Sequence, residues 1–194
     1  MIPFTQHTGK AVRLPHDNID TDQIIPSREM KSVSKTGLKD GLFAGWRYRE
    51  AGSRERVADF PLNAVPDATI IISGKNFGCG SSREHAVWAL REFGIRAVLA
   101  EGFGEIFYGN CVNNGVAAIT LPKDELDALG PWVEINLVER RIVSNDVAVE
   151  FAFDAGDHAR LVRGLDAIGM TLEKDSEIAE WVERDRAARG WAYL

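Results

Sequence analysis

The sequence predicts an α/β domain built on parallel βαβ units. Two observations carry this prediction. From residue 68 to residue 129, short apolar runs typical of buried strands alternate with amphipathic helical patterns. Residues 133–138 and 142–151 then alternate apolar and polar side chains, as hairpin strands do. The 194 residues can bury a real core, so we expect a single domain over residues 1–194 with mixed β/β/α layers and a helical C-terminal tail.

The N-terminal third is less regular. A strand is expected over residues 10–14, followed by an acidic turn over residues 16–22. Residues 26–67 are polar and poorly periodic. Because so long an irregular stretch in a compact domain is usually functional, we expect a functional role for this segment.

The remaining elements follow the periodicity of the apolar residues. Residues 82–93 predict a helix whose Ala86, Leu90 and Phe93 share one face, and Gly94 is a typical helix end. The other expected elements are strands over residues 68–73, 95–100 and 116–121, and helices over residues 105–113, 123–129, 157–169 and 176–189.

Composition argues against several classes of protein. The chain has 23 Lys+Arg and 29 Asp+Glu, a net charge of −6, whereas a general nucleic-acid or membrane-surface binder shows a basic excess. No aliphatic run approaches a membrane span, and residues 1–7 lack a signal-peptide pattern. The two cysteines, Cys79 and Cys111, fit a reducing compartment better than a disulfide framework. We therefore expect a cytoplasmic protein that binds neither nucleic acid nor membrane.

The segment over residues 75–86 is the first candidate site. It joins an expected strand to an expected helix through a glycine-rich turn, and a helix start with free N–H groups is suited to a carboxylate or phosphate. Arg83 adds a planar fork that binds carboxylates bidentately, and Ser81 and Ser82 add hydroxyls beside it. Together these groups suit a small anionic substrate.

Simpler interpretations of this segment stay open. Ser81 and Glu84 also have the spacing of a capping box, which needs no function. The glycines match neither a Walker A loop, nor a dinucleotide-binding fingerprint, nor a nucleophile elbow. Cys79 with His85 would suggest a thiol nucleophile, but the sequence marks no third, orienting group.

The acidic turn is the second candidate site. Asp17, Asp20 and Asp22 lie close enough in sequence to bind a metal, but their spacing is not that of a calcium loop. Aspartate also favours turns for purely local reasons, and on the residues alone the turn is the better interpretation.

Both segments together resemble a known family. Residues 17–26 and 76–86 are similar to the two signature motifs of the small subunit of 3-isopropylmalate dehydratase, and more broadly of the aconitase swivel domain. Residues 107–110 and 164–169 resemble further family stretches, and residues 42–47 resemble the longer bacterial form. The resemblance covers nearly the whole chain and implies an aconitase-type swivel fold.

The resemblance also implies a reaction. In this family a hydroxyl moves between adjacent carbons of 2-isopropylmalate and 3-isopropylmalate, as a step of leucine biosynthesis. A [4Fe-4S] cluster with one open iron binds the substrate hydroxyl and a carboxylate. The motif serine that takes the proton from carbon maps to Ser81, the carboxylate-binding arginine maps to Arg83, and Asp22 maps to an acidic residue lining the same site.

The cysteine count bears on where such a cluster sits. A site-open cluster needs about three thiolates, and this chain has two cysteines in all, so it cannot build the cluster alone. The resemblance therefore implies a separate large subunit that carries the [4Fe-4S] cluster, with this chain as one wall of the active site and no metal ligand on it. Whether the complex is a heterodimer or a heterotetramer stays open.

Substrate choice is expected in the segment after Pro26. In the family this loop contacts the variable part of the substrate. Met30 or Val33 would give apolar contact to an isopropyl group, whereas Arg28 or Lys31 would favour a further carboxylate or be solvated loop charges. Residues 155–158 depart from the family pattern, so a paralogue for a related alkylmalate or citraconate-type acid stays open, as does a non-catalytic anion- or RNA-binding module, which the acidic charge disfavours.

Overall fold

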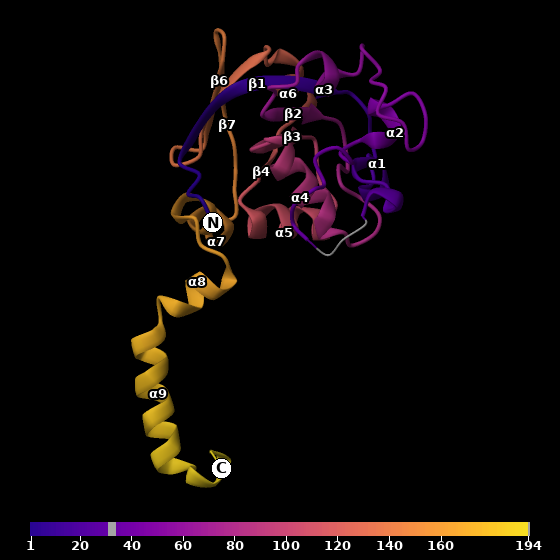
Figure 1. Ribbon diagram of the computed structural model, residues 1–194. Coiled ribbons are helices and arrows are strands. Elements are labelled where there is room, and N and C mark those ends of the chain that lie inside the picture. Colours follow the sequence, from indigo (N-terminus) through magenta and orange to yellow (C-terminus); the bar gives the residue numbers. More distant parts are fainter. Residues whose placement is uncertain (31–33, 194) are drawn as a thin grey trace. The chain divides into compact units, whose positions relative to one another are not determined.

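The computed structural model describes residues 1–30 and 34–193 (Figure 1). Its elements in chain order are β1 (Gln6–Leu14), α1 (Thr21–Ile24), the 3₁₀ helix η1 (Ser27–Glu29), α2 (Ala44–Arg47), α3 (Pro61–Ala64), β2 (Ile70–Ser73), α4 (Glu84–Phe93), β3 (Ala97–Ala100), α5 (Glu105–Asn114), β4 (Ala117–Thr120), α6 (Lys123–Ala128), β5 (Trp132–Asn136), β6 (Arg141–Ser144), β7 (Val147–Glu150), α7 (Ala155–Arg163), α8 (Ala167–Leu172), α9 (Asp175–Ala188) and the 3₁₀ helix η2 (Gly190–Ala192).

One mixed sheet organises the fold. Its strand order over the described residues is β4-β3-β2-β1-β5-β6-β7. The strands β1 to β4 pair in parallel with their neighbours. On the other side of β1, β5 pairs antiparallel with β1, and β6 and β7 follow it in antiparallel order. The long strand β1 joins the two halves, because residues 11–14 pair with β2 whereas residues 6–10 pair with β5. In Figure 1 it arches across the top of the domain.

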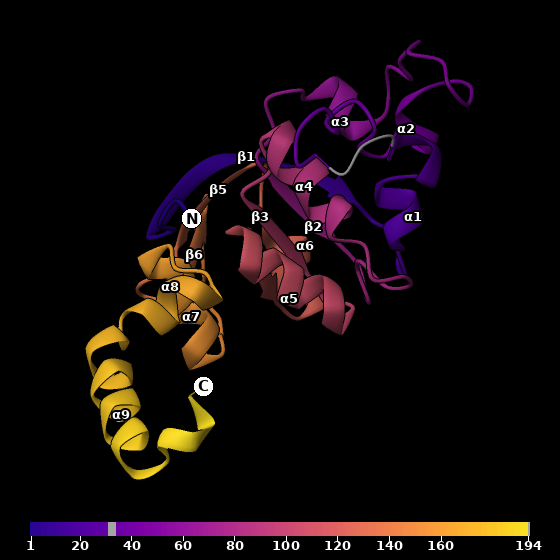
Figure 2. The ribbon, with the colours of Figure 1, turned by 60° about the horizontal axis from the view of Figure 1, so that its bottom comes forward.

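Side chains of the parallel strands alternate between two apolar layers, as the pleat of a strand requires. Ile71 on β2 and Val98 on β3 join a core cluster with residues of α4 and α5. Their neighbours Ile70 and Leu99 join a second cluster with residues of β5, β6 and α7. The helices α4 and α5 lie side by side in both views (Figures 1 and 2) and share one core cluster. The loop before α4 therefore leads into a helix that is anchored in the core.

The α/β prediction with central βαβ units is confirmed, with corrections at the ends of elements. The helix expected from residue 82 begins at Glu84. The strand expected over residues 10–14 extends back to Gln6, because its polar first half pairs with β5. The segment over residues 26–67, expected to be irregular, contains the short helices η1, α2 and α3. It also contributes the buried side chains of Leu42, Phe43 and Leu62 to the core.

The chain divides into two compact units, Met1–Gly164 and Leu165–Leu194. The first holds the sheet and α1 to α7; the second holds α8, α9 and η2, as expected of a helical tail. The assignment of residues 1–194 to a single domain stays a prediction. In the part of the chain that the structure describes, no helix is both long and apolar enough to span a membrane.

Candidate functional site

The two sequence motifs lie against each other. The backbone N–H of Gly78 donates to the carbonyl of Ile19 at 2.7 Å, and the N–H of Thr21 donates to the carbonyl of Cys79 at 3.0 Å. The buried Thr21 hydroxyl donates to the carbonyl of Ser81 at 2.9 Å. The turn after β2 and the turn before α1 are therefore one hydrogen-bonded unit, which brings the candidate residues of both motifs together.

The glycines of the second motif make this close approach feasible. Gly78 has φ +75°, and a Cβ there would stand 2.1 Å from Cγ of Phe107 on α5. Gly80 has φ +87°, a left-handed conformation that residues with side chains rarely adopt. Both glycines therefore have a backbone conformation that favours glycine, and Gly78 also has no room for a side chain.

Arg83 and Asp22 form the centre of the candidate site. The Arg83 guanidinium donates a hydrogen bond to Asp22 Oδ1, and the Ser27 N–H and hydroxyl donate to the same oxygen, each at 3.1 Å. The bond from Arg83 is the main reason why the pKa of Asp22 lies below its usual range. Arg83 thus pairs with a carboxylate of its own chain, and its binding of a substrate carboxylate stays a prediction.

Ser81 and Ser82 are exposed beside this pair. The capping-box interpretation of Ser81 and Glu84 is wrong, because the N-cap of α4 is Arg83 and no side chain caps it. Over residues 1–30 and 34–193, neither serine hydroxyl has a hydrogen-bond partner. Both hydroxyls are therefore available to a ligand, whereas in the first turn of α4 the N–H of Ala86 already donates to the carbonyl of Arg83 at 3.1 Å.

Each carboxylate of the acidic turn has hydrogen-bond partners within the chain. Asp17 Oδ1 accepts the N–H of Lys75 at 2.8 Å. Asp20 caps α1 by accepting the N–H of Gln23 at 2.7 Å, and the Gln23 side chain completes a capping box. Within the described residues no group of three or more His, Cys, Asp or Glu side chains is arranged to hold a metal ion. Asp20 thus has the local role of a helix cap, whereas Asp17 and Asp22 bind groups of the segment over residues 75–86.

Cys79 lies in the middle of the unit but has the wrong properties for a nucleophile. Burial, and then the charge of Asp20, raise the pKa of the Cys79 thiol, so the thiol stays protonated at neutral pH. The His85 ring packs against the Trp88 ring at 4.7 Å rather than against the thiol. The thiol-nucleophile alternative therefore has no geometric support.

A cavity of about 280 Å³ opens beside Asp22. Its lining residues are Asp20, Asp22, Gln23, Pro26, Arg28, Gly45 and Trp46. Arg28 is 44% exposed and its Nε lies 3.6 Å from Glu29 Oε1. Met30 is partly buried and packs against the core cluster below α4. Arg28 thus lies near the Asp22–Arg83 pair, whereas Met30 serves the core at least in part; Lys31 and Val33 lie outside the described residues.

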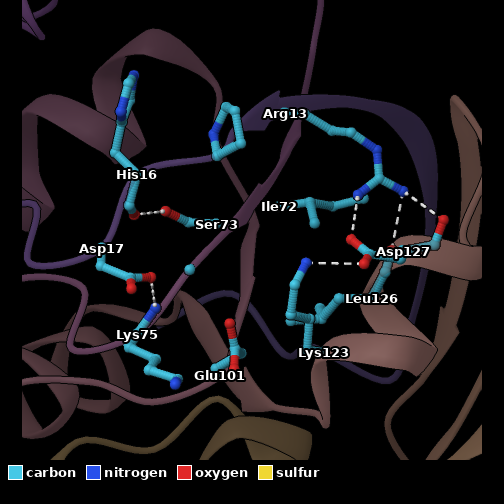
Figure 3. A pocket seen from close by; sticks show the side chains of 12 residues that line it. Arg13, His16, Asp17, Ile72, Ser73, Lys75, Glu101, Lys123, Leu126 and Asp127 are labelled. Atoms are coloured by element: carbon cyan, nitrogen blue, oxygen red, sulfur yellow. Dashed lines mark hydrogen bonds and ion pairs between the residues drawn. The ribbon is translucent and has the colours of Figure 1, made fainter.

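A larger cavity of about 460 Å³ lies where β1 and β2 end (Figure 3). Its charged lining residues are balanced in sign: Arg13, Lys75, Lys123, Asp17, Glu101 and Asp127. Arg13 donates to the carbonyl of Leu129 at 2.6 Å, and Lys123 pairs with Asp127 at 2.8 Å. Asp17 of the acidic turn lines this cavity, but the other residues proposed for substrate do not: Ser81, Ser82, Arg83, Asp22, Arg28 and Met30. The lining has no excess of positive charge for an anion. The candidate site is therefore the Asp22–Arg83 pair.

Sequence reasoning missed two parts of this site. Thr21 was passed over although it stands beside Asp22, since a buried hydroxyl bond cannot be read from a single sequence. Gly45 and Trp46 on α2 were given no site role, because a helix of four residues has no periodicity to reveal it.

Comparisons with known proteins show which family the chain belongs to. A profile of the aconitase C-terminal domain matches residues 1–124. The 3-isopropylmalate dehydratase small subunits of Cupriavidus necator and Rhizobium etli are 47% and 43% identical to this chain, over 100% and 99% of it and 99% and 100% of their own lengths. The chain belongs to the family of 3-isopropylmalate dehydratase small subunits.

A solved structure of this family has the same fold. A crystal structure of 3-isopropylmalate dehydratase from Methanocaldococcus jannaschii superposes with a TM-score of 0.70 at 27% identity, covering 90% of this chain and 98% of that one. The expected aconitase-type fold is confirmed by this match and by the domain profile.

An iron–sulfur cluster does not fit the residues of this chain. A cluster with one open iron needs about three thiolates, and the sequence has two cysteines, of which Cys111 is fully buried. Within the described residues no group of three or more His, Cys, Asp or Glu side chains surrounds either of them.

Proposed function

We propose that this chain is the small subunit of a cytoplasmic 3-isopropylmalate dehydratase, which interconverts 2-isopropylmalate and 3-isopropylmalate by dehydration and rehydration in leucine biosynthesis. The observation that carries the proposal is the Asp22–Arg83 pair beside the exposed hydroxyls of Ser81 and Ser82. A carboxylate-binding arginine next to unpartnered hydroxyls and an uncapped helix start is what a hydroxy dicarboxylate requires.

In the proposed reaction Arg83 binds a carboxylate of the substrate. Asp22 Oδ1 now occupies the guanidinium, so the substrate carboxylate takes a place next to Asp22 or displaces it from Arg83. The Asp22 side chain is 58% exposed, whereas the Arg83 side chain is only 22% exposed. Asp22 can therefore move away from Arg83 into solvent while Arg83 stays in place. Ser82 supplies a second hydroxyl contact to the bound substrate.

Ser81 takes the proton from the substrate carbon. A serine hydroxyl is a poor base, so the reaction needs Ser81 as its alkoxide. Those N–H groups of the glycine turn and of the start of α4 that donate to no carbonyl stabilise this alkoxide. The carbon-bound proton passes to Ser81 Oγ, the C–H electron pair forms the double bond, and the hydroxyl of the adjacent carbon leaves with the C–O electron pair as hydroxide, for which the large subunit's cluster would supply the Lewis acid. Return of the proton and the hydroxide to the double bond, with their carbons exchanged, completes the isomerisation.

The partner in this proposal is a large subunit that carries the [4Fe-4S] cluster. Two supports are on this chain: its cysteines are too few for a cluster, and its candidate site is a surface rather than an enclosed pocket. Arg28, which lines the cavity beside Asp22, and Met30 are proposed to contact the variable part of the substrate.

Anaerobic dehydration of 3-isopropylmalate, followed by the ultraviolet absorbance of the unsaturated acid, tests the proposal. This chain alone, the candidate large subunit alone, and their mixture with iron and sulfide restored are compared. Activity in the mixture only is expected. An assembled complex with a verified cluster that acts on a citraconate-type acid and not on isopropylmalate would overturn the substrate, and one that acts on neither would overturn the function.

A further inference from the structure

Asn114, the last residue of α5, makes three hydrogen bonds in a buried position. It is 3% exposed. Its Nδ2 donates to Glu84 Oε1 at 2.7 Å and to the carbonyl of Asn110 at 2.8 Å, and its Oδ1 accepts the indole N–H of Trp88 at 3.1 Å. Because an indole N–H can only donate, the amide oxygen must face Trp88 and the amide nitrogen must face Glu84. The orientation of the amide is therefore fixed.

These contacts join α5 to the first turn of α4. Glu84 is the first residue of α4 and follows Arg83 directly, and Trp88 stands one turn later on the same helix. The helix has no side-chain cap of its own, so this tether supplies the side-chain support at its start. The left-handed Gly115 ends α5 directly after Asn114 and so fixes where the amide stands.

The loop with Ser81 and Arg83 is then held from two sides. Thr21 on α1 binds the carbonyl of Ser81, and Asn114 on α5 binds the side chain of Glu84. Thr21 belongs to one of the two signature motifs. Asn114 comes from a different part of the sequence and contacts none of the candidate substrate-binding residues.

We propose that Asn114 and Glu84 form a positioning pair that sets the direction in which Ser81 and Arg83 face the substrate. The inference rests on the proposed function for its catalytic consequence. Asn114 acts only through Glu84 and the start of α4, so it is a positioning residue. Small displacements of reacting groups cost large factors in rate, so loss of the pair is expected to lower kcat about tenfold or more and to change KM little.

Two sets of variants in the assembled complex test the pair. Asn114→Asp replaces the donating amide by a carboxylate that faces Glu84, and is expected to lower kcat about tenfold or more. In the double variant Asn114→Asp with Glu84→Gln, the new amide at position 84 donates to the new carboxylate, so kcat is expected to recover in part. Asn136→Asp, on β5, is the matched control because its side chain acts only as an acceptor, for the N–H of Glu139 at 3.0 Å.

Variants of Glu84 test the same pair from its other residue, in case Asn114→Asp fails to fold. Glu84→Gln keeps an acceptor for Asn114 and should stay near wild type, whereas Glu84→Ala loses it and should match Asn114→Asp. Equal kcat for Glu84→Ala and wild type, or no recovery in a folded double variant, would overturn the pair.

A second measurement does not depend on activity. Hydrogen exchange of the backbone amides of residues 80–86, in the full chain, should be faster in Asn114→Asp than in wild type and in Asn136→Asp. If wild type shows no turnover but this exchange difference is present, the proposed function fails and the positioning pair stands. If exchange is unchanged, the positioning pair fails whatever the activity.

Discussion

At the residue scale, Arg83 pairs with a carboxylate of its own chain, and this contact is where we propose that the substrate carboxylate binds. The guanidinium has a planar set of donors, of which the contact with Asp22 uses one nitrogen. The remaining donors can meet a second carboxylate in a bidentate arrangement. Lysine offers a point charge and cannot reproduce that arrangement.

Arg83→Lys is therefore expected to lower kcat/KM of the assembled enzyme by about tenfold or more, the loss of about 1.4 kcal/mol or more of binding. Arg91→Lys is the matched control, because Arg91 lies at the other end of the same helix and is exposed. Steady-state kinetics with both variants checks this. An unchanged kcat and KM in Arg83→Lys would mean that Arg83 is only a charge at a helix start.

The sequence predicts the residues of the site better than their supports. Ser81, Arg83 and Asp22 stand inside two short motifs, and the resemblance of these motifs to a known family implies their roles. The structure brings Asp22 and Arg83 into contact. Asn114 could not be found in this way, because its partner Glu84 is 30 positions away in the chain. Contacts between helices depend on packing that a single sequence does not reveal.

At the scale of elements, the turn between β2 and α4 packs so closely against α5 that no Cβ fits at Gly78. Gly78 combines a positive φ with the short approach to Phe107. Gly78→Ala is therefore expected to lower the free energy of unfolding by roughly 1–3 kcal/mol. Denaturant unfolding of the isolated chain measures this difference.

Gly45→Ala serves as the control for that experiment. A Cβ at Gly45 would meet nothing within 4 Å, and its φ is not positive, so we expect a change within about 0.5 kcal/mol. Equal stabilities of the two alanine variants would contradict the close packing of the turn on α5.

Elements with clear periodicity were predicted well, and short ones were not. The apolar face of α4 and the alternation in β5 to β7 follow directly from the sequence. The helices α2 and α3 have four residues each, too few for a periodic pattern. The first half of β1 is polar and is a strand only because β5 lies beside it.

At the scale of the whole molecule, His7 gives stability a dependence on pH. It lies on β1, where Nε2 is 2.8 Å from the Thr69 hydroxyl oxygen. Burial, and then the charge of Arg96, lower the pKa of His7 below its ordinary value of about 6.5. Below that pH the unfolded chain binds more protons at this residue than the folded chain, so acid destabilises the fold through His7.

His7→Gln should remove this contribution. The variant is expected to lose less stability than wild type as the pH falls from about 6.5 through the lowered pKa of His7. Denaturant unfolding at a series of pH values checks the slope. Parallel curves for the two proteins over this range would contradict the account of His7.

The central claim concerns the complete enzyme: this chain contributes the proton-accepting serine to a site that a large subunit completes. Ser81→Ala tests it most directly, in a complex assembled with the large subunit and compared with Ser82→Ala. The Ser81 side chain is exposed and has no partner within the described residues, so its loss should leave folding and subunit association unchanged. The account predicts an assembled complex without measurable turnover of 3-isopropylmalate. Turnover near wild type in that complex would remove Ser81 from the mechanism and contradict the claim.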